Sequence, residues 1–384
     1  MTPLLKRWLP VALGSLLVLT SVRAADACPF CNMEGKTLTG EVRDATMVLY
    51  GSVGKGNETT DTTPFKIEAV VKKPDNPKLL GDGKVITLNR YLPDDKGQYR
   101  YLIFCDEFKG RIDPYYGVAV KLDSDIAKYL AKALELRDAP APKRLRFFFD
   151  YLDNADAEVS NDALKEFGKA DYADYKDMAK SLPPDKIAGW LKAKETQPFR
   201  YGLYASLLGH CGKAEHAKVL REMLDDKNKL QGPGVDGIMA GYTMLQPKEG
   251  WQFITSCMKD STKHFMVRYS ALKAVRFIHD YRPDLAKPKD MAEAVASQME
   301  QKDLGDMAIE DLRKWKCWDM ADRVLALRQT EAYKDVPIIR RAVLRFALDC
   351  KDHHPGCATY VAEMRKKDPE EVRDQEELLQ LQRQ

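Results

Sequence analysis

Residues 200–224, RYGLYASLLGHCGKAEHAKVLREML, contain two apolar patches separated by the polar segment GHCGKAEH. The apolar residues recur at the three- and four-residue intervals of an amphipathic helix. The separating segment is polar and contains two glycines, which is typical of a turn. The stretch therefore predicts two helices joined by a short turn, with the small residue Ala205 in the first apolar patch.

Similar apolar patches recur around an alanine throughout the chain after residue 143. Turn-forming segments such as SLPPDK, LQPKEG and CKDHHPG lie between them. The alanines are separated by 42, 35, 31, 37 and 34 residues, and irregular spacing of this size is typical of stacked helix pairs. A small residue at the recurring site lets neighbouring helices approach closely. These repeat-packing candidates are Ala163, Ala205, Ala240, Ala271, Ala308 and Ala342.

The segments 155–170, 200–224 and 265–277 resemble HEAT-type repeat proteins. In that family an Asp or Arg beside the recurring aliphatic sites packs between neighbouring repeats, and Asp162 and Arg268 stand in comparable places. The resemblance implies an all-α solenoid over residues 143–366 that binds a protein or peptide. The charged tail, 367–384, is expected to be a solvated cap or a frayed end.

The part before residue 122 has the pattern of short β-strands. Polar turn signals containing Gly or Pro separate the apolar stretches. Five short strands of this kind predict a small closed or nearly closed β-barrel. We expect residues 123–142 to form a helix and a proline-containing linker, because Pro140 and Pro142 interrupt helical hydrogen bonding. The expected strands are 45–53, 65–71, 85–88, 99–105 and 117–122.

The N-terminal Cys pair and the segments MVLYGSV, FKIEAVV and YLIFCD resemble netrin-type modules, which use an oligonucleotide/oligosaccharide-binding (OB) barrel. Members of that family begin with Cys-x-Cys, whereas this chain has Cys28-Pro29-Phe30-Cys31. The predicted fold is therefore multidomain β plus α, with an OB-like, netrin-like domain at 28–122 before the HEAT-like solenoid. Metalloprotease inhibitors of the netrin-type family place an N-terminal Cys on the zinc of their target.

The first residues predict an export signal. Lys6 and Arg7 precede an apolar core, Leu9 to Val22, that has the length of a signal peptide and is short for a membrane span. Small residues favour cleavage after Ala24 or after Ala27, so the signal is 1–24 or 1–27. The alternative is an uncleaved anchor. We expect a periplasmic or secreted protein without a transmembrane span in its mature chain.

Eight cysteines in an exported chain favour disulfides. We expect one bridge between Cys105 and either Cys28 or Cys31, and a second between Cys350 and Cys357, which flank a short polar loop. The pair Cys28-x-x-Cys31 has two other interpretations, a redox pair and a zinc site shared with Cys105. Covalent c-type haem is excluded because Asn32 stands where that motif needs His. The remaining cysteines, Cys211, Cys257 and Cys317, lie in apolar helical patterns as buried thiols.

Other side chains offer weaker candidates for chemistry. His353 and His354 could bind a metal, although a polar loop closed by a disulfide explains them more simply. His210 beside Cys211 could form a nucleophilic pair, although histidine at a helix end is commoner. Six aromatic residues could line a concave binding face, although core packing is the simpler explanation. They are Tyr172, Tyr175, Trp190, Trp251, Trp315 and Trp318.

Composition and motifs together favour a binding protein. The 384 residues suffice for two or three domains, and the net charge of +3 offers no electrostatic argument for a nucleic-acid partner. No phosphate-binding loop, G-x-S-x-G or H-E-x-x-H motif occurs, so we expect no cofactor and no enzymatic activity. The leading hypothesis is an exported scaffold that binds a protein or peptide. The alternatives are a modulator of an exported metalloprotease, which requires cleavage after Ala27, and a thiol–disulfide oxidoreductase that uses Cys28 and Cys31.

Overall fold

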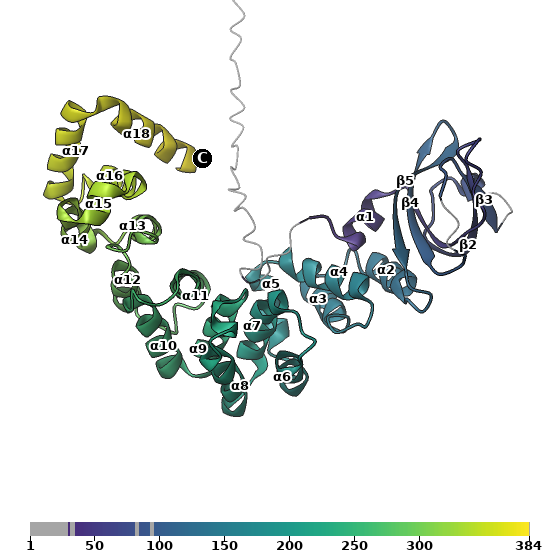
Figure 1. Cartoon of the computed structure of the whole chain (residues 1–384), viewed down its shortest axis with the longest axis horizontal. Coiled ribbons are helices and arrows are strands. Elements are labelled where there is room, and N and C mark those ends of the chain that lie inside the picture. Colours follow the sequence, from purple (N-terminus) through teal and green to yellow (C-terminus); the bar gives the residue numbers. More distant parts are fainter. Residues whose placement is uncertain (1–29, 31–34, 81–83, 93–95, 384) are drawn as a thin grey trace, which may run out of the picture.

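The computed structural model describes residue 30 and residues 35–80, 84–92 and 96–383. A β-sheet lies at one end of the molecule, and helices follow it in chain order along a curved path (Figure 1). The β-plus-α class is therefore confirmed. The predicted export signal, Cys28 and Cys31 lie outside the described residues.

Five antiparallel strands form the sheet in the order β3-β2-β1-β4-β5. The number of strands is the predicted one, and the sheet curls into a half-barrel in which the edge strands β3 and β5 come into contact. The strands are β1 Met47–Val53, β2 Thr63–Lys72, β3 Val85–Leu88, β4 Arg100–Phe108 and β5 Arg111–Val120.

Both faces of the central strand β1 are buried. Val48 and Tyr50 pack with the helices, whereas Met47 and Leu49 point into a second cluster enclosed by the curl of the sheet. Successive side chains of a strand point to opposite faces, so a strand covered on both sides needs apolar residues at consecutive positions. This explains the uninterrupted apolar run in β1.

The described helices cover most of the chain after the sheet. Short 3₁₀ turns occur between some of them, for example Lys229–Gln231. The α-helices are α1 Leu38–Asp44, α2 Ile126–Glu135, α3 Ala141–Phe149, α4 Ala157–Gly168, α5 Tyr172–Ala179, α6 Pro184–Lys192, α7 Tyr201–Cys211, α8 Ala214–Asp225, α9 Val235–Leu245, α10 Pro247–Lys259, α11 Phe265–Tyr281, α12 Pro288–Ala296, α13 Gly305–Lys314, α14 Ala321–Ala326, α15 Glu331–Asp335, α16 Pro337–Cys350, α17 Pro355–Lys367 and α18 Pro369–Arg383.

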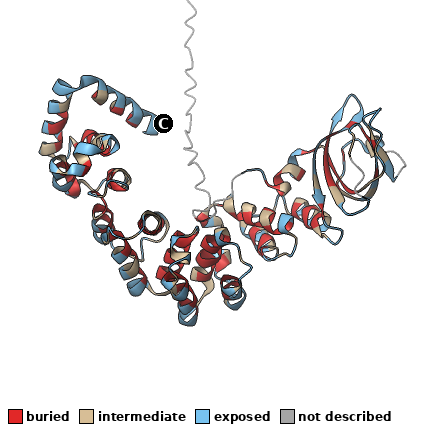
Figure 2. Ribbon diagram, viewed as in Figure 1, coloured by how far each residue is buried: buried red, intermediate tan, exposed pale blue. Residues whose placement is uncertain are grey.

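Contacts between these helices follow two rows. In one row, α3 contacts α5, α5 contacts α7, α7 contacts α9, and α9 contacts α11. Further along the chain, α13 contacts α16 in the same way. The second row includes the contacts of α6 with α8 and of α10 with α12, and it lies on the outer side of the curve (Figure 1). A connected cluster of buried apolar side chains runs from Val42 to Leu379, and the buried positions follow the curve of the helices (Figure 2).

The contact between α7 and α9 brings two backbones together. A Cβ atom at Gly241 would lie 2.2 Å from the carbonyl oxygen of Ala205, and one at Gly237 would lie 2.4 Å from that of Gly202. Residues 201–208 and 235–243 are buried at every position, so both helices are covered on all sides. These glycines are therefore required by the close approach of α7 and α9.

The charged tail, which was expected to be a solvated cap or a frayed end, is helical and packs on neighbouring helices. It forms the helix α18, whose Val372 and Leu379 are buried. Arg313 of α13 donates hydrogen bonds to Asp349 at 2.6 Å and to Gln382 at 2.7 Å. These contacts join α13, α16 and α18, and they explain why a segment of weak apolar pattern is ordered.

Residues 126–135 form α2 and residues 136–140 connect it to α3, in the stretch 123–142 where a helix and a proline-containing linker were expected. The helix α3 itself begins at Ala141 and has a proline in its first turn. Proline is tolerated there because the first helical N–H groups have no intrahelical acceptor. The helix α1, before the first strand, was not predicted, because seven residues are too few for a clear helical period.

We predict that Gly241→Ala lowers the free energy of unfolding by about 1–3 kcal/mol, because the new methyl group overlaps the Ala205 carbonyl. Gly189→Ala in α6 is the matched control, since nothing lies within 4 Å of its added Cβ. The control should gain about 0.5–1 kcal/mol from helix propensity. Urea unfolding of both full-length variants measures the difference, and equal stabilities would contradict the close α7–α9 contact.

Candidate functional site

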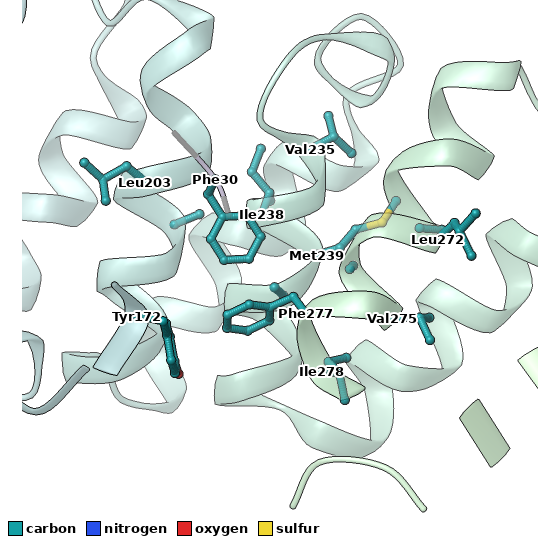
Figure 3. Close-up of a cluster of buried hydrophobic side chains, with 14 of the residues drawn as sticks. Phe30, Tyr172, Leu203, Val235, Ile238, Met239, Leu272, Val275, Phe277 and Ile278 are labelled. Carbon is teal, nitrogen blue, oxygen red and sulfur yellow. The ribbon is translucent and has the colours of Figure 1, made fainter. Parts of the chain in front are cut away.

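Phe30 lies among side chains of α7, α9 and α11 (Figure 3). Its side chain is 2% exposed, and its ring centroid lies 4.6 Å from that of Phe277 in α11. Its backbone rests on α7, because a Cβ at Gly202 would come within 2.9 Å of the Phe30 carbonyl oxygen. Ile238 of α9 lies beside the ring in Figure 3. We call the surface formed by Gly202, Ile238 and Phe277 the Phe30 seat.

The Phe30 seat joins residues that are far apart in the chain. Burying a phenylalanine side chain contributes about 1.5–3 kcal/mol, so the contact stabilises the packing of these helices around Phe30. The sequence showed Phe30 only as the apolar residue between the two cysteines of the N-terminal motif. Its burial depends on helices that begin 170 or more residues later, and no local pattern signals such a contact.

A polar pocket lies next to the Phe30 seat. Its volume is about 430 Å³. Tyr172 belongs to both places, because its ring lies 5.2 Å from that of Phe277 and 5.4 Å from that of His210. We call this cavity the Tyr172 pocket. Its lining consists of Tyr172, Lys176, Asp177, Lys180, Gly209, His210, Met244, Tyr281 and Arg282.

His210 is neutral in this pocket at ordinary pH. Burial, together with the positive charges of Arg282, Lys180 and Lys176, lowers the pKa of His210 to about 4, and Asp177 opposes this shift. The buried Nε2 atom of His210 has no hydrogen-bond partner among the described residues. The neutral imidazole therefore lies among positively charged side chains, and its Nε2 atom contacts no carboxylate that would stabilise a charged ring.

Tyr172 presents a second polar atom without a partner. Its residue is 3% exposed, and its hydroxyl makes no hydrogen bond of normal geometry with the residues that the structure describes. Burial raises the pKa of Tyr172 to about 12, although the nearby Arg282 guanidinium opposes that rise. The hydroxyl therefore stays protonated and retains a hydrogen to donate.

The cations of the pocket are only partly neutralised. Arg282 donates from Nε and Nη2 to the carboxylate of Asp284, at 2.8 and 2.7 Å, and Lys180 donates to Asp177 at 2.8 Å. Lys176 makes no ion pair within the described part of the chain. The pocket therefore carries a net positive charge.

The arrangement does not support a Cys–His nucleophile at this place. The thiol of Cys211 donates to the Leu207 carbonyl at 3.3 Å. Burial raises the pKa of Cys211 to about 11, so the thiolate that such chemistry needs is scarce at neutral pH. The predicted interpretation of His210 as a residue at a helix end agrees with its place in the last turn of α7.

The predicted repeat-packing residues lie at helix contacts. Asp162 is buried in α4 and accepts hydrogen bonds from Thr39 Oγ1 at 2.6 Å and from the Tyr129 hydroxyl at 2.8 Å, so it joins α1, α2 and α4. Arg268 of α11 pairs with Asp303 before α13 at 2.5 Å. The recurring small residues Ala163, Ala205, Ala240, Ala271, Ala308 and Ala342 are all fully buried.

The described cysteines carry free thiols. Cys105 is buried in the cluster enclosed by the sheet, whereas Phe30 packs in the other cluster. The predicted disulfide partner of Cys105, Cys28 or Cys31, lies outside the described residues. Cys350 and Cys357 are both buried, and their thiols share a hydrogen bond. The two predicted bridges therefore stay predictions.

The remaining predicted candidates lie in separate places. Tyr172 and Tyr175 are buried, and of the two only Tyr172 lines the pocket. His353 stacks on Trp318, and His354 Nε2 lies 3.3 Å from Asp322. Within residues 35–80, 84–92 and 96–383, no three His, Cys, Asp or Glu side chains gather as metal ligands. No described helix is long and apolar enough to cross a membrane.

Comparisons with protein-family models, with curated proteins and with solved structures return no match.

We predict that Phe30→Ala lowers the free energy of unfolding by about 1–3 kcal/mol, because the variant loses the buried contact of the ring with Phe277. Limited proteolysis should cleave the variant near residue 30 faster than the native chain, and chemical unfolding measures the loss of stability. Phe108→Ala is the control, because the Phe108 side chain is 59% exposed. Identical cleavage rates in the two variants would contradict the docking of Phe30.

We predict that His210 makes the fold less stable in acid. The unfolded chain binds a proton at the ordinary His pKa of 6.5, whereas folded His210 binds it only near pH 4. The unfolded state therefore holds more protons between these values, so stability falls as pH falls through this window. Between pH 7 and pH 4.5, His210→Gln should lose less stability than the native chain, by on the order of 2 kcal/mol in urea unfolding. An equal loss in both proteins would contradict the buried, neutral ring.

Proposed function

We propose that the protein is a non-enzymatic interaction scaffold whose helices bind an extended peptide segment through an aromatic side chain. The observation that carries the proposal is the burial of Phe30 by helices far away in the chain. A surface that encloses the Phe30 side chain has the apolar lining that an aromatic-bearing peptide of a partner requires.

The two rows of helices support a HEAT-like solenoid as the frame of this scaffold. Contacts within a row join α7 to α9 and α9 to α11, and contacts between rows join α8 to α9 and α10 to α11. Each helix pair in such an array packs mainly on its neighbours, so the array keeps a long inner surface for binding. The fully buried small residues at the recurring positions support the same architecture.

The N-terminal sheet supports an OB-like, netrin-like module with a second contact surface. Five antiparallel strands curl until β3 and β5 come into contact, as expected of a small, partly open barrel. Tyr115 and Tyr116 of β5 are exposed on its surface. Exposed tyrosines favour interfaces, because they offer a large apolar area and a hydrogen-bonding end.

The redox alternative uses Cys28 and Cys31, which lie outside the described residues, and the thiols that the structure does describe offer no second redox candidate. Burial raises the pKa of Cys105 and Cys357 to about 12, and that of Cys317 to about 11. Thiol exchange requires the thiolate, which is rare at neutral pH for thiols of this kind. Export to the periplasm or the exterior, proposed from the first 27 residues, places the scaffold where partners are themselves exported.

A peptide competition experiment tests the proposal. The probe is a fluorescent peptide of residues 25–36 with serine in place of both cysteines, and the protein is the full chain carrying Phe30→Ala. We expect the probe to bind this chain at least tenfold more tightly than the native chain, because the Phe30 seat of the native chain is already filled. Fluorescence anisotropy measures the binding.

Two controls define the outcome of that experiment. A probe with alanine in place of its phenylalanine should not bind, and a Phe108→Ala chain should bind the original probe as weakly as the native chain does. Equal binding of the probe to all three chains, or no binding to a folded Phe30→Ala chain, would overturn the proposal.

A further inference from the structure

The Tyr172 pocket contains hydrogen-bond donors that converge without an acceptor. Lys176 has no ionic partner in the described part of the chain, and the bonds of Arg282 to Asp284 use Nε and Nη2, which leaves Nη1 free of that pair. The Tyr172 hydroxyl and His210 Nε2 are buried without a hydrogen bond of standard geometry to a described residue, and the Arg282 guanidinium, which lies beside the Tyr172 oxygen, offers that hydroxyl no acceptor for its proton. Buried polar groups are normally paired, so this set indicates a missing acceptor.

The charges around the pocket decide what kind of acceptor fits. Lys176, Lys180 and Arg282 line the cavity with only one carboxylate, that of Asp177, among the lining residues. A cation would be repelled by this set, and a neutral ligand would not balance it. The side chains of Tyr281 and Met244 add an apolar wall, and the volume of about 430 Å³ lies in the range of sites for small molecules.

We propose that the Tyr172 pocket binds a small organic anion, whose carboxylate or phosphate oxygens accept hydrogen bonds from Lys176, Arg282, Tyr172 and His210. The carbon skeleton of the ligand lies against Tyr281 and Met244. Oxyanions suit this donor set, because their oxygens accept several charge-assisted hydrogen bonds at once. The site is distinct from the Phe30 seat, although Tyr172 contacts both.

The pKa of His210 can be measured to report whether an anion occupies the pocket. The groups that face His210 are Arg282, Lys176, Lys180 and Asp177, with Tyr172 and Tyr175 stacked beside the ring. A bound anion offsets the three cations and favours the charged imidazole. The pKa of His210 should therefore rise from about 4 toward its ordinary value when the pocket is filled.

Calorimetric titration of the full chain at pH 7 tests the proposal with two probes, inorganic phosphate and benzoate. We expect saturable binding of at least one probe in the millimolar range or tighter, and a loss of at least fivefold in affinity in Lys176→Gln and in Arg282→Gln. Lys218→Gln is the matched control, because it removes the same charge at a side chain that is 82% exposed on α8. Its affinity should stay within about twofold of the native value.

The two probes distinguish the source of the oxyanion. Tighter binding of benzoate assigns a carboxylate ligand with an apolar body, and tighter binding of phosphate assigns a phosphate-bearing ligand. Nuclear magnetic resonance of the His210 ring, assigned with His210→Gln, should show the expected rise of its pKa with the bound probe. The absence of saturable binding of both probes, or equal affinities in the lysine variants Lys176→Gln and Lys218→Gln, would overturn the proposal.

The result is independent of the proposed scaffold function. Lys176 does not form part of the Phe30 seat, so Lys176→Gln should leave peptide binding by the Phe30→Ala chain unchanged. If Arg282→Gln fails to fold because its ion pair with Asp284 is lost, Lys176→Gln carries the test, since its exchange breaks no ion pair between described residues.

Discussion

The direct contact between the backbones of α7 and α9 is the constraint on which the packing around Phe30 depends. Gly237 and Gly241 of α9 lie against the carbonyl oxygens of Gly202 and Ala205, so that not even a methyl group fits between the two helices. Helices at this distance pack with little freedom to slide, because close-packed interiors do not deform continuously. Gly202 also contacts the Phe30 backbone, so the same approach that locks the two helices forms the floor of the Phe30 seat.

An aromatic chain connects the apolar and polar parts of the inner surface. Phe30 contacts Phe277, and Phe277 contacts Tyr172, which in turn lies beside His210. The apolar end of this chain gains free energy by excluding water, whereas the polar end retains donors that are costly to bury without an acceptor. The Phe30 seat and the Tyr172 pocket are therefore neighbours that differ in chemistry, with Tyr172 between them.

Part of this organisation could be predicted from local patterns. The strands could be predicted because they are short apolar runs, and the run in β1 is buried on both faces. The recurring alanines, such as Ala205, are buried in the helices, where a small residue lets neighbouring helices approach closely. The helix α1 and the order of α18 could not be predicted in this way. The first is held by Asp162 from α4, and the second by Arg313 from α13, and both contacts join segments that are far apart in the sequence.

The sequence by itself determined the division into a β part and an α part, because the apolar period changes near residue 123 and period depends only on neighbouring residues. It also determined where small residues would recur. Only the tertiary structure decided that Phe30, and not a tryptophan of the helices, occupies the centre of the array, and that Tyr172 and His210 meet Arg282 in one pocket. Burial and the loss of hydrogen-bond partners arise when distant segments pack together, so they leave no pattern along the chain.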